Sequence, residues 1–87
     1  MIFTVYILYS KTIDKYYVGH TDDPERRLIE HNTGQTRYTS QQGSPWELVY
    51  AQKFDNRAAA ARREREIKSK KNRKYIQELI KRLERPA

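Results

Sequence analysis

The sequence contains no cysteine, one methionine, and only three glycines and three prolines among its 87 residues. The lack of cysteine excludes disulfides, thiol nucleophiles and zinc sites with a sulfur ligand, and it points to a reducing compartment. No run approaches 18 consecutive apolar residues, and residues 1–10 have neither a preceding basic segment nor a small-residue cleavage site. We therefore expect a soluble, cytoplasmic protein with no membrane partner.

Several motifs of large enzyme classes are missing as well. The sequence has no glycine-rich phosphate loop, no HExxH zinc motif and no Ser/His/Asp signature. Nothing in it therefore points to a small-molecule cofactor. A chain this short buries only a little over about 60% of the surface that its unfolded form exposes, so its core must be small. We expect residues 1–87 to form a single domain, and the sequence does not indicate its oligomeric state.

Positive charge is abundant and unevenly distributed. The chain has 18 Lys and Arg against 11 Asp and Glu, a net charge of +7. Residues 1–56 have 6 basic and 7 acidic side chains, whereas residues 57–87 have 12 basic and 4 acidic ones, a net charge of +8. Such a basic block attracts polyanions through counterion release and long-range electrostatics. The net charge is in the range expected for a nucleic-acid-binding domain, but the block would attract DNA, RNA or an anionic membrane alike, and a solvated helix face has the same composition.

Three segments have the residue types of β-strands. Residues 2–9 are apolar, β-branched or aromatic on both alternating faces, which is typical of a central strand covered on both sides. Residues 16–20 resume this character after a short polar connection, which predicts an antiparallel hairpin. Residues 46–54 supply a third strand, after a polar loop over residues 34–45.

Capping residues and periodicity predict three helices. Asp23 followed by Pro24 is a typical start for the first helix, and Asp55 or Asn56 can cap the second. Asn72 is the expected cap of the third helix, whose apolar residues follow the i, i+3, i+4, i+7 spacing of an amphipathic helix. The order β-β-α-β-α-α predicts an α+β fold, a three-stranded antiparallel sheet flanked by helices.

Two tyrosines in the first two strands are candidates for a site. A hairpin could bring Tyr6 and Tyr17 together. Because successive side chains of a strand alternate, Tyr16 and Tyr17 should project from opposite faces of the sheet. Tyrosines are also common in strands, so neither position alone indicates a function.

Charged residues on the helices are further candidates. Arg27 and His31 are four residues apart and share a helix face, and a guanidinium suits a phosphate because it offers two parallel donors. Glu64 lies within the basic run of residues 62–66, where a carboxylate is usually a salt-bridge partner. If it faces a cleft instead, its oxygens are suitable ligands for Mg²⁺.

Four blocks of sequence together give the most specific signal: VYIL around Tyr6, YYVGHT around Tyr17, DPERRLIEHN and AAAARREREIK. In this order and spacing they resemble the GIY-YIG nuclease domain, in particular small stand-alone proteins similar to the N-terminal domain of the excision-repair incision subunit. The resemblance covers about residues 3–74. It implies the same sheet flanked by helices, and a metal-dependent endonuclease that acts on DNA in repair or in the processing of branched or damaged DNA.

The resemblance also implies roles for particular residues. Tyr17, assisted by Tyr6, would accept the proton of the attacking water, while Arg27 braces the phosphate. Glu64 would hold one Mg²⁺ or Mn²⁺ ion. We therefore expect Tyr6, Tyr17, Arg27 and Glu64 to converge on one concave, positively charged surface.

Three more positions match the family pattern. His20 follows the second motif directly, and His31 matches a histidine found in some branches, so that either would share in proton transfer. Asn72 is the best candidate for the late asparagine of the family, although its spacing from Glu64 is short.

The basic last third of the chain offers contacts for the nucleic-acid backbone, and the candidates are Arg62, Arg63, Lys70, Lys71 and Lys74. Two other interpretations stay open. One is a nucleic-acid-binding module of the same fold with little or no cleavage activity. The other is a structural or ribosome-associated RNA-binding protein, which is supported by the basic block alone.

Overall fold

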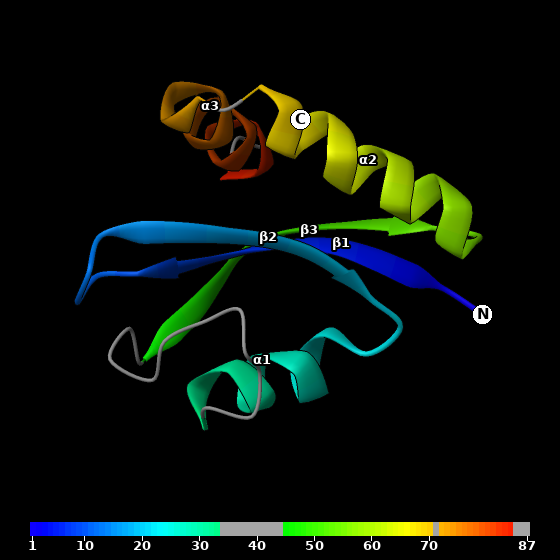
Figure 1. The fold of residues 1–87 in the computed structure, drawn as a ribbon, viewed down its shortest axis with the longest axis horizontal. Helices are drawn as coiled ribbons and strands as arrows, with labels where there is room; N and C mark the ends of the chain where they lie inside the picture. The colour runs from blue at the N-terminus through cyan, green and yellow to red at the C-terminus, as the bar shows by residue number, and fades with distance from the viewer. Residues whose placement is uncertain (34–44, 71, 85–87) are drawn as a thin grey trace.

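Three antiparallel strands form the centre of the molecule (Figure 1). The structure, a computed structural model, describes residues 1–33, 45–70 and 72–84. Strand β1 (Phe3–Ser10) lies between β2 (Lys15–Thr21) and β3 (Trp46–Phe54). The expected central strand is confirmed, since side chains on both of its faces are buried. Most of the expected loop lies outside the described residues.

Helices cover both faces of this sheet. Helix α1 (Pro24–Asn32) packs on one face, while α2 (Arg57–Ser69) and α3 (Arg73–Glu84) lie on the other (Figure 1). The element order is therefore β-β-α-β-α-α, and the predicted α+β fold is confirmed. In the described part of the chain, no helix is long and apolar enough to cross a membrane.

Two hydrophobic clusters join the layers. The cluster beneath α1 consists of Tyr6, Leu8 and Trp46, with Ile13, Tyr17 and Leu28 packed against it. The cluster beneath α2 and α3 consists of Val5, Ile7, Val18, Tyr50, Ala60, Ile67 and Leu79. Each cluster takes alternate residues of β1, because successive side chains of a strand point to opposite faces. The position of a residue along β1 therefore determines whether its side chain packs against α1 or against α2 and α3.

The helices begin where the sequence predicts. Asp23 and Asn56 each accept a hydrogen bond from the backbone N–H three residues later, at 3.1 Å and 2.8 Å. Asn56 rather than Asp55 is therefore the cap of α2. The side chain of Asn72 accepts the backbone N–H of Lys74 at 2.9 Å, at the start of α3. These caps satisfy N–H groups that have no partner within their own helix.

An ion pair connects α3 to the β1–β2 hairpin. Arg73 donates to the Asp14 carboxylate at 2.9 Å and also to the Asp14 backbone carbonyl. Its guanidinium lies over the ring of Tyr16, 5.2 Å from the centroid, and Tyr9 packs against the same ring at 4.8 Å. The contacts hold Tyr16 in place between the hairpin and α3.

Candidate active site

Three aromatic side chains gather beneath α1, and we call Tyr6, Tyr17 and His31 the aromatic triad. The ring centroids are 6.2 Å apart for the two tyrosines and 4.7 Å apart for Tyr17 and His31. A hydrogen bond of 3.1 Å joins the Tyr6 hydroxyl to Nε2 of His31. Tyr6 is 2% exposed and His31 is fully buried. The sheet therefore places both tyrosines on one face, as the hairpin predicts.

The glycine of the second strand makes this arrangement possible. Gly19 is paired with Tyr6 across the two strands. A Cβ atom at Gly19 would lie 2.6 Å from the Tyr6 hydroxyl oxygen and 3.2 Å from Cε1 of Tyr17. Glycine in a strand often marks the close approach of another group. The absence of a side chain at Gly19 leaves room for the buried ring of Tyr6 to lie over β2.

We expect Gly19→Ala to destabilise the protein by about 1 to 3 kcal/mol, the usual cost of overpacking a buried site. The new methyl group must displace Tyr6, which is held in place by its own packing. Urea denaturation measures the change in the free energy of unfolding. The same substitution should cost less in a Tyr6→Phe background, because the closest clashing atom is then absent. If Gly19→Ala lowered the free energy of unfolding equally with and without Tyr6→Phe, a clash with the Tyr6 hydroxyl would not be the cause.

Burial controls the charge states of the triad. Burial raises the pKa of Tyr6 to about 12, although the nearby Arg27 guanidinium opposes the shift. Burial lowers the pKa of His31 to about 4, and the charge of Arg27 acts in the same direction. Both groups are therefore neutral at neutral pH. Tyr6 can donate or accept hydrogen bonds there, but it is not a phenolate.

His31 should make the stability depend on pH. The unfolded chain takes up a proton near pH 6.5, whereas the folded protein does so only near pH 4, so stability falls as the pH drops through this window. A shift of this size corresponds to about 3 kcal/mol. Urea denaturation from pH 7 to pH 4 should show this loss for the protein and for His20→Gln. A His31→Asn variant with the same pH dependence would refute the prediction.

Arg27 lies at the side of the triad. It is half-buried and donates to Oε1 of Glu30 at 3.0 Å. This hydrogen bond, followed by an interaction with the Tyr6 hydroxyl, raises the pKa of Arg27. The helix arginine is thus close to the tyrosine, as the sequence motifs led us to expect. A phosphate would have to compete with Glu30 for the guanidinium.

Glu64 approaches the site from the opposite layer, on α2. Its two carboxylate oxygens bind different partners, with Nδ1 of His20 at 2.7 Å and Nζ of Lys68 at 2.9 Å. The Glu64 side chain is 20% exposed. Burial alone would raise the pKa of this carboxyl, but the hydrogen bonds from Lys68 and His20 outweigh it and hold the pKa below its ordinary value. Glu64 is therefore ionised at neutral pH.

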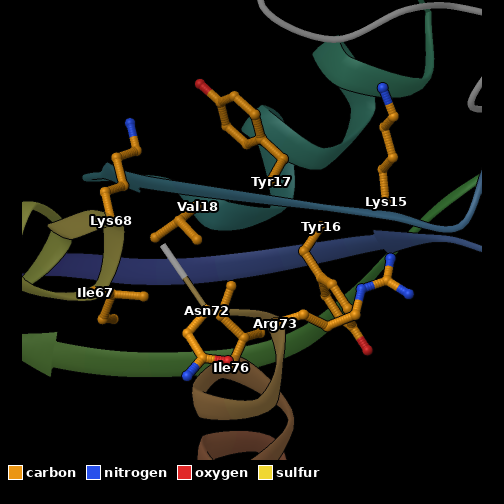
Figure 2. Close-up of a pocket in the computed structure, with 9 residues that line it drawn as sticks. All are labelled: Lys15, Tyr16, Tyr17, Val18, Ile67, Lys68, Asn72, Arg73 and Ile76. Atoms are coloured by element: carbon orange, nitrogen blue, oxygen red, sulfur yellow. The ribbon is translucent and has the colours of Figure 1, made fainter. Parts of the chain in front are cut away.

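The two groups of residues meet at the edge of the sheet. Tyr17 extends toward α1 while His20, three residues later on the edge strand β2, faces α2, because successive side chains of a strand point to opposite faces. Lys68 reaches from α2 along this edge, with Nζ 5.9 Å from the centroid of the Tyr17 ring (Figure 2). The charge of Glu64 also raises the pKa of Tyr6. We call this arrangement of triad, Arg27, His20, Glu64 and Lys68 the edge site.

The chemistry of the edge site limits how a metal could bind. Among the described residues there is no group of three or more His, Asp or Glu side chains that could hold a metal ion. Mg²⁺ usually keeps several waters and uses one or two carboxylates together with substrate phosphates. Glu64 alone fits such a shared ion. A metal would also have to replace His20 or Lys68 at one carboxylate oxygen.

Most of the predicted backbone-binding residues that the structure describes are exposed, namely Arg62, Lys70 and Lys74. Arg63 differs from them, because its side chain is only 18% exposed. It donates to the Gln52 side chain and to the Tyr75 hydroxyl, each at 3.2 Å. Arg63 therefore packs between α2, α3 and the sheet, and these contacts favour a structural role. Lys71 lies outside the described residues.

Sequence reasoning missed Lys68 as a member of the site. A signal for it was available, because Lys68 follows Glu64 by four residues on a helix and such pairs lie side by side. Its position beside Tyr17 depends on how α2 lies on the sheet, and helix periodicity does not give this.

Comparisons with known proteins identify the family of the chain. The model of the GIY-YIG catalytic domain matches residues 2–77. A UPF0213 protein of Natronomonas pharaonis is 42% identical over 65 residues, which cover 75% of each chain. The structure-specific endonuclease subunit SLX1 of Phaeosphaeria nodorum is 46% identical over 48 residues, which cover 51% of this chain and 13% of SLX1.

A solved structure gives the same result for the fold. The solution NMR structure of a UPF0213 protein from Bacillus halodurans is 33% identical to this chain, with a TM-score of 0.58. The match covers 93% of this chain and 84% of the other. The resemblance found in the four sequence blocks is therefore confirmed, and the chain belongs to the GIY-YIG catalytic domain family.

Proposed function

We propose that this protein is an endonuclease that hydrolyses phosphodiester bonds of DNA with the help of a divalent metal ion. The observation that supports this best is the edge site, where the aromatic triad and Arg27 meet an ionised Glu64 from the opposite layer. SLX1 is named a structure-specific endonuclease subunit, which favours branched DNA, as in repair or processing, as the substrate class.

Each residue of the edge site has a separate role in the proposed hydrolysis. Phosphodiester hydrolysis requires a deprotonated water and neutralised phosphate oxygens, so positioning and electrostatics provide most of the acceleration. Arg27 binds the phosphate through its guanidinium after exchanging Glu30 for it. Tyr17 accepts the proton of the attacking water as a phenolate and becomes a neutral phenol. Because an ordinary tyrosine is a poor base at neutral pH, nearby cations such as Lys68 have to favour the phenolate. Tyr6 remains neutral and orients the triad through its hydrogen bond to His31, which is also neutral.

Glu64 would hold the metal, which fits Mg²⁺ or Mn²⁺ because both prefer oxygen ligands. When bound, such an ion neutralises charge on the phosphate and on the leaving oxygen. His20 and Lys68 keep the carboxylate ionised and oriented before binding. His20, released from Glu64, is then available for proton transfer.

The exposed cations Arg62, Lys70 and Lys74 bind the DNA backbone, and Lys71 is a further candidate from the sequence alone. They lie in the segment with a net charge of +8. Each phosphate contact contributes to affinity by releasing counterions, whatever the base sequence. This binding alone therefore gives little selectivity among DNA structures.

We expect the double substitution Lys70→Ala and Lys74→Ala to weaken DNA binding and to flatten its salt dependence. If both lysines touch phosphates, the slope of log affinity against log salt should fall by up to about 1.8. Fluorescence anisotropy over a range of salt concentrations measures this slope. Lys53→Ala, an exposed lysine of β3, is the control and should leave the slope unchanged. A slope unchanged in the double variant would show that this face is merely solvated.

The direct test of the proposed function is a cleavage assay. The purified protein is incubated with labelled duplex, nicked, flapped and branched DNA, and with matched RNA, in the presence of Mg²⁺, Mn²⁺ or EDTA. Cuts that depend on the metal support the endonuclease. Cleavage in EDTA, or none with any substrate, would overturn it.

One observation favours the alternative of a binding module with little or no activity. Both carboxylate oxygens of Glu64 already have cationic or histidine partners, so a metal must compete for the site. In this case gel-shift experiments should show complexes with DNA, while the cleavage assay shows no cuts.

A further inference from the structure

A pocket of about 420 Å³ lies beside the edge site, between β2 and the two helices α2 and α3. Pockets that bind small organic groups usually have volumes of about 300 to 1,000 Å³. Lys68 connects the two, because it lines the pocket while its Nζ contacts Glu64 and lies 5.9 Å from the centroid of the Tyr17 ring. A group bound in the pocket would therefore lie next to the proposed site of cleavage.

The lining combines apolar, aromatic and cationic side chains. Val18, Ile67 and Ile76 provide an apolar surface. Val18 and Ile67 belong to the cluster beneath α2 and α3, and Ile76 packs against it. Tyr16 and Val18 extend from β2 away from the side of Tyr17 (Figure 2). No carboxylate is found among the described residues that line the pocket. The surface thus suits a flat, weakly polar ring that is attached to a negatively charged chain.

Tyr16 is held in position before anything binds. Arg73 lies over its ring, Tyr9 packs against it, and Asp14 fixes Arg73 through an ion pair. Groups that are ordered in advance lose less conformational entropy on binding. Asn72, at the start of α3, lies at the pocket wall. Its Oδ1 accepts the backbone N–H two residues later at 2.9 Å, and its side-chain NH₂ group can donate to a bound group.

We propose that this pocket binds an unpaired nucleobase of the substrate, next to the phosphate that is cut. This inference rests on the proposed function, and it specifies which DNA structure the site would select as a substrate. The rings of paired bases are stacked in a duplex and cannot enter a pocket, whereas an unpaired base can be inserted among aromatic and apolar side chains. Asn72 can then bond the exposed base edge, and Lys68 can meet a flanking phosphate. The selected substrates are single strands or flaps at a junction.

Binding of a duplex with a short single-stranded arm tests this inference. One form has normal bases in the arm, and the other has only abasic nucleotides there, with the same number of phosphates. Fluorescence anisotropy in EDTA measures both affinities without cleavage. Because stacking on a protein side chain contributes to affinity for each base, we expect the abasic arm to bind about 5- to 150-fold more weakly. A 2-aminopurine in the arm should also change its fluorescence on binding.

Variants assign the effect to the pocket. Tyr16→Leu should remove most of the difference between the two arms and leave binding of the abasic arm nearly unchanged. Tyr75→Leu is the matched control, because it replaces another half-buried tyrosine that does not line the pocket. Circular dichroism checks that both variants fold.

The outcomes separate the two proposals. Equal affinities for the two arms, together with cleavage of branched DNA, would overturn the nucleobase pocket and leave the endonuclease standing. The nucleobase pocket would also be overturned if Tyr16→Leu kept the full difference in affinity between the normal and the abasic arm. Absence of binding to either arm would overturn both proposals.

Discussion

Replacing Glu64 by glutamine is expected to reduce DNA cleavage by about 1000-fold or more, because it removes the carboxylate that would hold the metal. DNA binding should stay the same or improve slightly, since a negative charge near the phosphates is lost. Single-turnover cleavage and anisotropy measure the two effects separately. The loss of the carboxylate also removes the ion pair with Lys68, so the melting temperature should be recorded alongside.

The neighbouring Glu66→Gln is a suitable control. Glu66 lies on the same helix, is exposed, and pairs with Arg63 outside the edge site. Its replacement should leave cleavage within about twofold, because single surface ion pairs contribute little. If Glu64→Gln lost DNA binding and melted far below the unmodified protein, Glu64 would be a structural residue instead.

Tyr17→Phe should reduce cleavage by about 100- to 10,000-fold, the usual contribution of a general base. The ring and its packing against His31 and Tyr6 are retained, so stability should change little. Figure 2 shows the hydroxyl of Tyr17 extending away from the strand, and the residue is partly exposed. The measurement is the single-turnover rate with saturating protein, which excludes effects on binding.

Tyr50→Phe serves as the control for the loss of a tyrosine hydroxyl. Tyr50 is buried in the cluster beneath α2 and α3, and its hydroxyl donates to Gln52. It should retain the cleavage rate of the unmodified protein. A Tyr17→Phe protein with an unchanged rate would exclude Tyr17 as the proton acceptor and direct attention to His20.

The order of the elements and their caps could be predicted because both follow from local sequence. Asp23 and Asn56 bind the N–H groups of their own helices, so no knowledge of the tertiary structure is needed. The opposite faces of Tyr16 and Tyr17 are also local, since they follow from strand alternation. The structure places Tyr16 with the cluster beneath α2 and α3, and Tyr17 with the cluster beneath α1.

The contacts between elements could not be predicted in the same way. The pair of Glu64 with His20 joins residues 44 positions apart, and it depends on how α2 lies over β2. The inward position of Arg63 depends equally on the distance between α2, α3 and the sheet. Charge alone predicted exposure for Arg63, but the long apolar part of an arginine side chain allows it to pack inside.

The edge position of β2 means that the two halves of the site can change independently of each other. The aromatic triad is fixed by the cluster beneath α1, and Glu64 by a helix that packs on the other cluster. A small shift or a single substitution in α2 would alter Glu64, the proposed metal ligand, without repacking the tyrosines. A relative without this carboxylate could therefore still have an intact tyrosine pair. The carboxylate on α2, rather than the two tyrosine motifs, is then the better marker when active and inactive members of the family are to be distinguished.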